Sequence, residues 1–442
     1  MSTLPELIAE AGVVGAGGAG FPTHVKATSK VDYFLVNGAE CEPLIHKDFE
    51  LMLHHAEEIV KGSLLMKNQV GAATGLICIK SKNKAAIDAI SAHLPGTGLA
   101  IFELGDFYPS GDEYEIVHSA TGRLMPPGGI PLNVGCVVNN VESVLNVYRS
   151  SINKPVTEKF VCVTGAVKSP KSFWVPIGTT FGELIDFCGG VTVEKYGIYV
   201  GGVMMGKLTF DRTEVVTKTT GGLIILPEDH KLIQRKNQPE KNWHKIGKSA
   251  CDQCSYCTEY CPRYLLGYDV QPHKVMRSLG FTGQDNSMWN LYADLCCSCG
   301  LCTLYACPED LFPKEACDQS KRENKAAGIK MQQKKPVEVH PFKEGRRVPL
   351  KQLVKRLGLS EFEAHTPFTS EKPVPKWVKI MLRQHVGDAA LSSVKEGTSV
   401  KAGDKLAEPA TGKMGSTIHA SISGLVREVN PAYVIIENSG DR

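Results

Sequence analysis

The stretch CDQCSYCTEYCPRYLLG, residues 251–267, decides how the centre of this chain folds. Its cysteines stand at positions 251, 254, 257 and 261, and a proline follows the last one. The spacing C-x2-C-x2-C-x3-C-P is typical of segments that ligate two iron–sulfur clusters. A second group repeats the pattern with one additional residue, at Cys296, Cys299, Cys302 and Cys307, followed by Pro308.

The spacing of both groups predicts which cysteine binds which cluster. Three thiolates two residues apart wrap a loop around one face of a cubane, and the fourth cysteine of each group ligates the other cluster. The predicted ligands are Cys251, Cys254, Cys257 and Cys307 for cluster 1, and Cys261, Cys296, Cys299 and Cys302 for cluster 2. The longer gap before Cys307 makes it the least typical ligand. Zinc is the alternative, but zinc sites use pairs of C-x2-C, often with histidine.

The composition is that of a globular protein with several domains. Its 442 residues exceed one ordinary core, and 42% are hydrophobic and 22% charged. A net charge of +3 gives no argument for nucleic acid. Neither a long apolar run nor a secretory signal is visible, so we expect a cytoplasmic protein without a membrane span. Fifteen cysteines then indicate metal ligands and buried thiols rather than disulfides.

A glycine-rich stretch near the N-terminus, GAGGAGFPTHVK at residues 15–26, suggests a ligand loop. It satisfies G-x-G-x-x-G, but the dinucleotide-binding fingerprint requires a preceding strand. PELIAEAG, which precedes it, predicts a helix, so we reject that interpretation. Glycines still allow backbone to approach a phosphate or a flat ring closely. Taken alone, the stretch would be more simply explained as a flexible loop without a ligand.

Three further motifs follow the glycine loop in order. They are YFLVNGAECEP from Tyr33, YPSGDEYE from Tyr108 and NVGCVVNNVE from Asn133. Together with the loop, they resemble the GxGGAGFP, N-x-x-E-x-EP, YxxGxE and NNVE motifs of the flavin-binding subunit of respiratory complex I and of the RnfC family. The resemblance spans residues 7–150.

This resemblance implies that FMN and NADH bind to the N-terminal region. The implied FMN contacts are Gly15, Gly17, Gly18 and Lys26 at the phosphate and ribityl chain, and Asn37, Glu40, Asp112, Asn139 and Asn140 at the ring. Phe21 is implied to stack on nicotinamide or adenine, and Glu42 and Glu113 to contact NADH. Complex I carries arginine in place of Ala16 and aspartate in place of Ala39, a difference that concerns NADH more than the flavin. Without the motifs, the acidic residues would be interpreted as a solvated loop.

The remaining segments complete a multidomain α/β and α+β chain. The expected units are an FMN/NADH-binding domain (1–152), an SLBB β-grasp domain (153–230), a ferredoxin-type helical domain with two 4Fe–4S clusters (245–330), a basic linker or helical arm (331–375) and a barrel-sandwich hybrid (376–442). The last unit resembles lipoyl-like modules but has no lysine at its hairpin tip, HASISG, so we expect a non-carrier module.

Two polar segments flank the cysteine region. Residues 231–247 are expected to form a linker. Residues 319–356 carry twelve Lys or Arg against three Asp or Glu. A solvated helical arm is the favoured interpretation of this run, and a docking surface for an acidic partner or a nucleotide is the alternative.

The domain order, the C-x4-C-P gap and the cysteine stretch together resemble the PduS family of cobalamin reductases from propanediol-utilisation microcompartments. The resemblance implies transfer of electrons from NADH through FMN and two 4Fe–4S clusters to cobalamin, in support of a cobalamin-dependent diol dehydratase. It also implies a corrinoid-handling enzyme and microcompartment shell or cargo proteins as partners. One alternative is an RnfC-like subunit that delivers electrons to a protein acceptor or ferredoxin. Another is a non-enzymatic scaffold protein that retained its clusters. No catalytic side chain and no corrin site are predicted.

Overall fold

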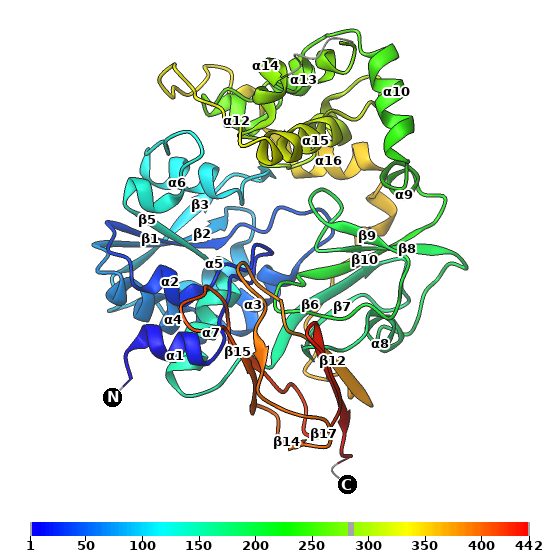
Figure 1. Cartoon of the computed structure of the whole chain (residues 1–442). Coiled ribbons are helices and arrows are strands. Elements are labelled where there is room, and N and C mark those ends of the chain that lie inside the picture. The colour runs from blue at the N-terminus through cyan, green and yellow to red at the C-terminus, as the bar shows by residue number, and fades with distance from the viewer. Residues whose placement is uncertain (1, 282–286, 441–442) are drawn as a thin grey trace.

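The computed structural model describes residues 2–281 and 287–440, which form four packed units (Figure 1). Residue 1, residues 282–286 and residues 441–442 of the expected domains lie outside these ranges. The N-terminal unit and the β-grasp unit lie side by side, the cysteine-rich helical unit covers one end of both, and the barrel-sandwich unit lies at the other end (Figure 1). Among the described helices, none is long and apolar enough to cross a bilayer.

The N-terminal unit is a parallel sheet with helices on its faces. Its strands, in the spatial order β3-β2-β1-β5, are β1 (Tyr33–Gly38), β2 (Thr74–Lys80), β3 (Leu99–Leu104) and β5 (Cys136–Asn140). Its helices are α1 (Leu4–Glu10), α2 (Thr23–Ala27), α3 (Lys47–His54), α4 (Ala56–Gln69), α5 (Lys84–Ser91), α6 (Glu113–Thr121) and α7 (Val141–Ser151). The chain runs outward from β1 to β3 and then returns to β5 on the other side of β1. In open parallel sheets, ligands bind at the carboxyl ends of the strands where the order reverses, here between β1 and β5.

The second unit is a five-stranded sheet in the order β7-β6-β10-β8-β9, packed on one helix. Its elements are β6 (Glu158–Gly165), β7 (Lys171–Pro176), α8 (Phe181–Phe187), β8 (Tyr196–Val200), β9 (Lys207–Thr209) and β10 (Gly222–Pro227). Strands β6 and β10 are parallel and the other neighbours antiparallel. The apolar face of α8 is buried against this sheet through Phe181, Leu184 and Ile185.

The third unit consists of short helices that surround the cysteines. They are α9 (Lys231–Lys236), α10 (Glu240–Ala250), α11 (Tyr256–Glu259), α12 (Pro262–Leu265), α13 (Pro272–Ser278), α14 (Ser287–Asn290) and α15 (Pro313–Ala326), with a π-helical turn at Cys302–Ala306. The expected linker at 231–247 is wrong, because α9 and α10 occupy it. Leu232, Ile233 and Trp243 are buried there, so these apolar side chains fix the segment against its neighbours.

Most Lys and Arg side chains of the expected solvated arm after the cysteines are exposed, but part of the segment is packed. Strand β11 (Val348–Pro349) pairs antiparallel with β4 (Phe107–Tyr108), and helix α16 (Leu350–Leu357) follows it. Lys343 Nζ lies 2.7 Å from a carboxylate oxygen of Glu115, and both side chains are buried. The segment therefore returns to the N-terminal unit and packs against it.

The C-terminal unit consists of two small sheets. Its strands are β12 (Trp377–Met381), β13 (Leu391–Ser392), β14 (Ser399–Val400), β15 (Lys405–Glu408), β16 (Ile418–His419), β17 (Gly424–Val429) and β18 (Tyr433–Asn438). The sheets have the orders β12-β18-β17-β14 and β13-β15-β16. At the HASISG tip, the Ser421 hydroxyl donates a hydrogen bond to the Ile177 carbonyl oxygen (2.5 Å). This tip is buried against the β-grasp unit, which fits the packing role expected for a non-carrier module.

Candidate functional site

The glycine loop lies against the carboxyl end of β5. The Gly15 N–H donates to the Phe21 carbonyl oxygen (2.9 Å), and the Gly20 N–H donates to that of Gly15 (3.1 Å), so the loop closes on itself. A Cβ atom on Gly17 would lie 3.4 Å from the Asn140 side chain. Gly18 has φ +107°, and a Cβ atom there would meet open space. One side of the loop is therefore packed on the strand end and the other is open for a ligand.

Buried acceptors without a partner lie at the same place. Asn139 and Asn140 end β5 and are paired in register with Val36 and Asn37 of β1. The Asn139 Oδ1 atom and the Ser110 Oγ atom are buried and have no hydrogen-bond partner among the described residues. Such atoms cost about 1–3 kcal/mol each and call for an explanation such as a bound group. A flavin ring, which carries an N–H donor, fits this requirement. Ser110, within YPSGDE, was not predicted from the sequence.

Three predicted residues converge beside the loop. Lys26 Nζ donates to the Val138 carbonyl oxygen (2.7 Å) in β5. The same ammonium lies 5.8 Å from the centroid of the Phe21 ring and 3.7 Å from a Glu113 carboxylate oxygen. A cation and an aromatic face thus stand at the loop that is expected to hold a nucleotide.

Two predicted carboxylates are engaged by backbone groups. Glu40 accepts hydrogen bonds from the N–H groups of Asp48 (2.8 Å) and Phe49 (3.2 Å) at the start of α3. Glu42 accepts from those of Met204 (3.1 Å) and Met205 (2.9 Å) in the β-grasp unit. Burial raises the pKa of each carboxyl group to about 7. A direct contact of Glu42 with NADH would require its carboxylate to leave this loop, and in this arrangement both side chains position neighbouring segments.

A buried charge network beneath the glycine loop was missed by the sequence analysis. Lys159 Nζ, from β6, lies 2.6 Å from a Glu142 carboxylate oxygen and 3.1 Å from the Ala16 carbonyl oxygen. Lys47 contacts the same Glu142 oxygen at 2.9 Å. Burial opposes ionisation of Glu142, but Lys159 and Lys47 together lower its pKa. Glu142 is the last residue of the NNVE motif, whereas Lys159 belongs to none of the motifs found in the sequence.

Asp112 connects the predicted flavin site to the cysteine-rich unit. It caps α6 by accepting hydrogen bonds from the N–H groups of Tyr114 (3.0 Å) and Glu115 (3.3 Å). It also accepts two from the Arg263 guanidinium, at 2.7 and 3.0 Å. This guanidinium lies 3.5 Å from the centroid of the Tyr114 ring. Arg263 is two residues beyond Cys261, so the contact joins the two predicted cofactor regions.

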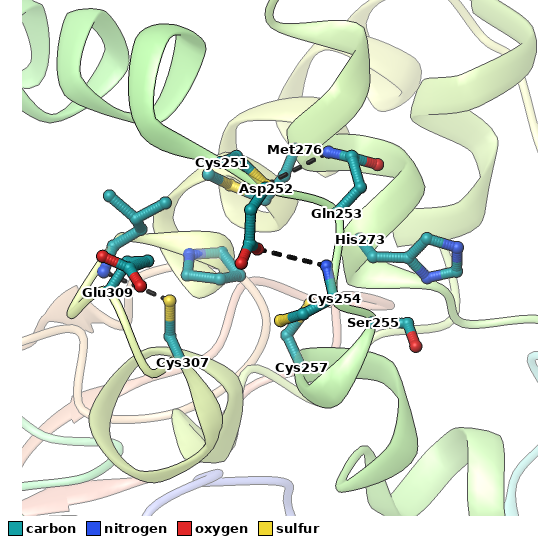
Figure 2. A pocket seen from close by; sticks show the side chains of 12 residues that line it. Cys251, Asp252, Gln253, Cys254, Ser255, Cys257, His273, Met276, Cys307 and Glu309 are labelled. Atoms are coloured by element: carbon teal, nitrogen blue, oxygen red, sulfur yellow. Dashed lines mark hydrogen bonds between the residues drawn. The ribbon is translucent and has the colours of Figure 1, made fainter.

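The predicted cluster 1 ligands surround a single pocket. Figure 2 shows Cys251, Cys254, Cys257 and Cys307 around its centre. Gln253 Nε2 donates to the Cys251 sulfur (3.1 Å), and the Leu311 N–H donates to the Cys307 sulfur (3.3 Å). Hydrogen bonds to ligand sulfur are one means by which proteins tune cluster potentials. Within the described ranges, no three His, Cys, Asp or Glu side chains converge on one ion position.

Both cysteine triplets have the same backbone conformation. Gln253 and Ser298, each two residues after the first cysteine, have φ of +64° and +57°. Ser255 and Gly300, each one residue after the second cysteine, have φ of +67° and +83°. Non-glycine residues adopt this left-handed region at a cost and persist there only where the surroundings impose it. The repetition indicates two equivalent loops built around equivalent groups.

The additional residue before Cys307 is absorbed locally. Residues Cys302–Ala306 form a π-helical turn, the conformation that accommodates one inserted residue. Cys261 has φ −71° and ψ 119°, and Cys307 has φ −74° and ψ 118°. The fourth cysteine of each group therefore leaves its turn in the same conformation despite the unequal gaps.

The predicted cluster 2 ligands are buried near one another. Burial raises the pKa of Cys302, and Cys296, Cys257 and Cys261 raise it further. Four thiolates so placed would repel one another unless a cationic centre lay between them. Cys317 contacts Cys296, and Cys297 contacts Cys299, so two additional thiols lie at this group. The Tyr108 hydroxyl donates to the Cys299 carbonyl oxygen (2.7 Å), which holds this loop against the N-terminal unit.

Comparison with known families assigns a type to each unit. Residues 8–149 match the Nuo51 FMN-binding domain, 160–208 the SLBB domain, 250–312 a 4Fe-4S dicluster domain and 362–440 the RnfC barrel sandwich hybrid domain. The expected fold class is confirmed. The dicluster match favours iron–sulfur clusters over zinc.

Whole-length relatives decide the family. The chain is 39% identical to the cobalamin reductase PduS of Citrobacter freundii, over 98% of this chain and 96% of that protein. It is 40% identical to that of Salmonella typhimurium, over 98% and 95%. The chain belongs to the PduS family.

More distant relatives share only part of the chain. One subunit of the proton-translocating ferredoxin:NAD(+) oxidoreductase complex of Clostridium ljungdahlii is 35% identical over 59% of this chain and 55% of that protein. Among solved structures, an air-oxidized NAD+-reducing [NiFe]-hydrogenase has a TM-score of 0.47 at 18% identity, covering 82% of this chain and 67% of its own.

Proposed function

We propose that this protein is an oxidoreductase that transfers electrons from NADH, through FMN and two 4Fe–4S clusters, to cobalamin. The match to cobalamin reductases along almost the whole chain supports this function. The observation that carries it is the continuity of the site. The strand-end site is joined through Asp112 and Arg263 to the cluster 2 cysteines, which adjoin those of cluster 1.

The N-terminal residues bind and orient the flavin and the nucleotide in this proposal. The backbone of the glycine loop and the Lys26 ammonium hold the anionic phosphate, since both supply donors to it. Asn139 and Ser110, whose side-chain oxygens are buried and without a partner among the described residues, would accept hydrogen bonds from the flavin ring. Phe21 offers a ring face to the nucleotide. When bound, FMN supplies the step from two-electron hydride chemistry to one-electron transfer.

The cysteine-rich unit carries single electrons away from the flavin site. Its eight predicted ligands would hold two 4Fe–4S clusters, which supply one-electron transfer when bound. Arg263 and Tyr108 keep the cluster 2 loops against the N-terminal unit. The cluster 2 ligands thus lie toward the flavin and the cluster 1 ligands lie further along the path.

The RnfC-like alternative, with a protein acceptor, has support from the partial match to a subunit of a ferredoxin:NAD(+) oxidoreductase complex. We favour cobalamin because the matches that cover the whole chain are to cobalamin reductases. Support of a diol dehydratase inside a microcompartment, among shell or cargo proteins, is part of the same proposal and rests on the PduS relationship.

Anaerobic titration with NADH tests the path. Loss of both the flavin band and the broad iron–sulfur absorbance is expected, followed by reduction of added cob(III)alamin. Reduction by dithionite but not by NADH would contradict NADH as the donor. Reduction of both cofactors by NADH without any cobalamin reduction would contradict the acceptor.

A further inference from the structure

The Cys307 residue lines two cavities at once. One is the pocket shared by the cluster 1 cysteines (Figure 2). The other is an open surface hollow of about 780 Å³ between α11, the π-helical turn and α16, which we call the tyrosine hollow. Its wall includes Tyr256, Tyr260, Tyr305, Arg346, Lys355 and Arg356. The hollow is thus separated from the cluster 1 pocket by little more than a ligand residue.

Three tyrosine side chains line the tyrosine hollow. Tyr260 and Tyr305 meet edge to face, with their ring centroids 5.5 Å apart. Tyr256, one residue before the ligand Cys257, is 44% exposed. The Tyr305 hydroxyl is held by Gln352 Oε1 at 3.3 Å. Large aromatic surfaces of this kind bind flat or apolar ring systems, and their hydroxyls offer hydrogen bonds at the rim.

Three cationic side chains also line the hollow, and one of them, Arg346, lies 5.1 Å from the centroid of the Tyr260 ring. Arg346 is paired with Glu259 (2.6 Å), and Arg356 is paired with Asp310 (3.1 Å). Lys355 is exposed on α16 and has no carboxylate partner within residues 2–281 and 287–440. One cation of the hollow is thus available to an anionic group, and the basic run noted in the sequence supplies it.

We propose that the tyrosine hollow binds the corrinoid that accepts electrons, with Tyr305 against the macrocycle and Lys355 at the anionic phosphodiester of its nucleotide tail. This inference rests on the proposed function. Three features favour a corrinoid over an acidic protein. The hollow is open to solvent but has a volume in the range of small-molecule sites, its wall carries three tyrosine rings, and two of its three cations are already neutralised.

The redox balance of the step is simple. Oxidation of one NADH to NAD+ releases two electrons and one proton. Two molecules of cob(III)alamin take up one electron each at the hollow and become cob(II)alamin, while the proton goes to solvent. No bond to a protein atom forms or breaks.

Two variants of the full-length protein test the site: Lys355→Glu and Tyr305→Ala. The matched control is Lys395→Glu, the same charge change on an exposed loop of the barrel-sandwich unit, at the other end of the molecule (Figure 1). Binding is measured by equilibrium dialysis of cyanocobalamin against oxidised protein, which requires no turnover. Kinetics are measured anaerobically with NADH and aquacobalamin, and separately with ferricyanide as acceptor.

Each test variant is expected to raise the Kd for cyanocobalamin and the KM for aquacobalamin about tenfold, the effect of losing one good polar or aromatic contact. Lys395→Glu is expected to match the wild type. Equal Kd values in all four proteins, or no binding of cyanocobalamin by the wild type, would overturn the assignment of the corrinoid to the hollow. If Lys355→Glu slows the reduction of an acidic electron-carrier protein and leaves the Kd for cyanocobalamin unchanged, the hollow binds a protein partner and the corrinoid assignment is wrong.

The same set of experiments separates this inference from the proposed function. If the wild type reduces ferricyanide with NADH but never cobalamin, the proposed acceptor is wrong, and the proposed corrinoid site is wrong as well. If the wild type reduces cobalamin and the variants do so with unchanged KM and Kd, the function stands and only the hollow is wrong.

Discussion

Replacing Arg263 by alanine should weaken the joint between the flavin and cluster units more than any comparable surface change. The guanidinium is 8% exposed, donates two hydrogen bonds to Asp112 and lies against the Tyr114 ring. Its removal would leave the half-buried Asp112 carboxylate with only its two backbone donors. Arg212, which pairs with Asp186 on the β-grasp surface, provides the matched control, because both partners there are exposed.

The expected magnitudes differ severalfold. Removing one partner of a buried ion pair costs about 3–5 kcal/mol of unfolding free energy. Breaking an exposed pair costs about 0–1 kcal/mol. For a unit of 150–250 residues, about 1 kcal/mol corresponds to 2–4 °C in Tm, so Arg263→Ala should lower the Tm by at least about 6 °C. Arg212→Ala should lower it by a few degrees at most.

The assay is anaerobic thermal unfolding of the purified protein, combined with iron analysis. A double-mutant cycle with Asp112→Ala should give a coupling energy of about 2 kcal/mol. Arg263→Lys should retain part of the stability, since lysine keeps the charge but not the planar fork. Arg263→Ala should also slow the NADH-driven loss of the iron–sulfur absorbance relative to the loss of the flavin band. Equal Tm shifts for Arg263→Ala and Arg212→Ala, at full iron content, would refute this reasoning.

Three further predictions follow from buried groups. Burial lowers the pKa of Lys218 to about 7. Between about pH 7 and 10.5 the unfolded chain therefore binds one more proton than the folded chain, so the unfolding free energy of the wild type should rise with pH over this window, by up to about 5 kcal/mol relative to Lys218→Met. Parallel pH profiles of the two proteins would contradict this. Cys261→Ser should lose about half of the iron, whereas Cys297→Ser should keep all of it, as measured by iron and sulfide analysis; equal losses would exclude the ligand assignment. Lys159→Met should weaken retention of FMN about tenfold, because the charge network holds the glycine loop through Ala16; unchanged flavin content after filtration would show that the loop does not need it.

The parts of the site that the sequence predicted are those encoded in short segments. The cysteine triplets form loops whose conformation depends on residues inside the motif, such as Gln253 and Ser298. The glycine loop and the Asn139–Asn140 strand end are equally local. Their meeting at one edge of the sheet follows from the parallel order of β1 and β5. Spacing was therefore enough to predict which of these residues lie together.

The parts that were missed depend on contacts between distant segments. Arg263 reaches Asp112 across 151 positions of the chain, and Lys159 reaches Ala16 across 143. The Glu42 carboxylate turns to Met204 because the β-grasp loop presents two free N–H groups there. Residues 231–247 looked like a polar linker because their few apolar side chains gain a partner only when the cluster unit packs beside them. No local pattern carries this information.

The single residue that lengthens the second cysteine group adds one side chain to the turn before Cys307. Each of the four positions between Cys302 and Cys307 has its own contact. The Thr303 hydroxyl donates to Glu315 (2.8 Å), Leu304 packs in the core beside Cys299, Ala306 is buried, and Tyr305 lines the tyrosine hollow. A gap of three, as in the first group, would remove one of these positions and turn the side chains before it by about 100° around the helix axis. The π-helical turn keeps Cys307 in the conformation of Cys261 and still provides a place for Tyr305. The insertion is therefore compatible with the predicted ligand role of Cys307, and it lets the same turn supply both buried contacts and a side chain of the tyrosine hollow.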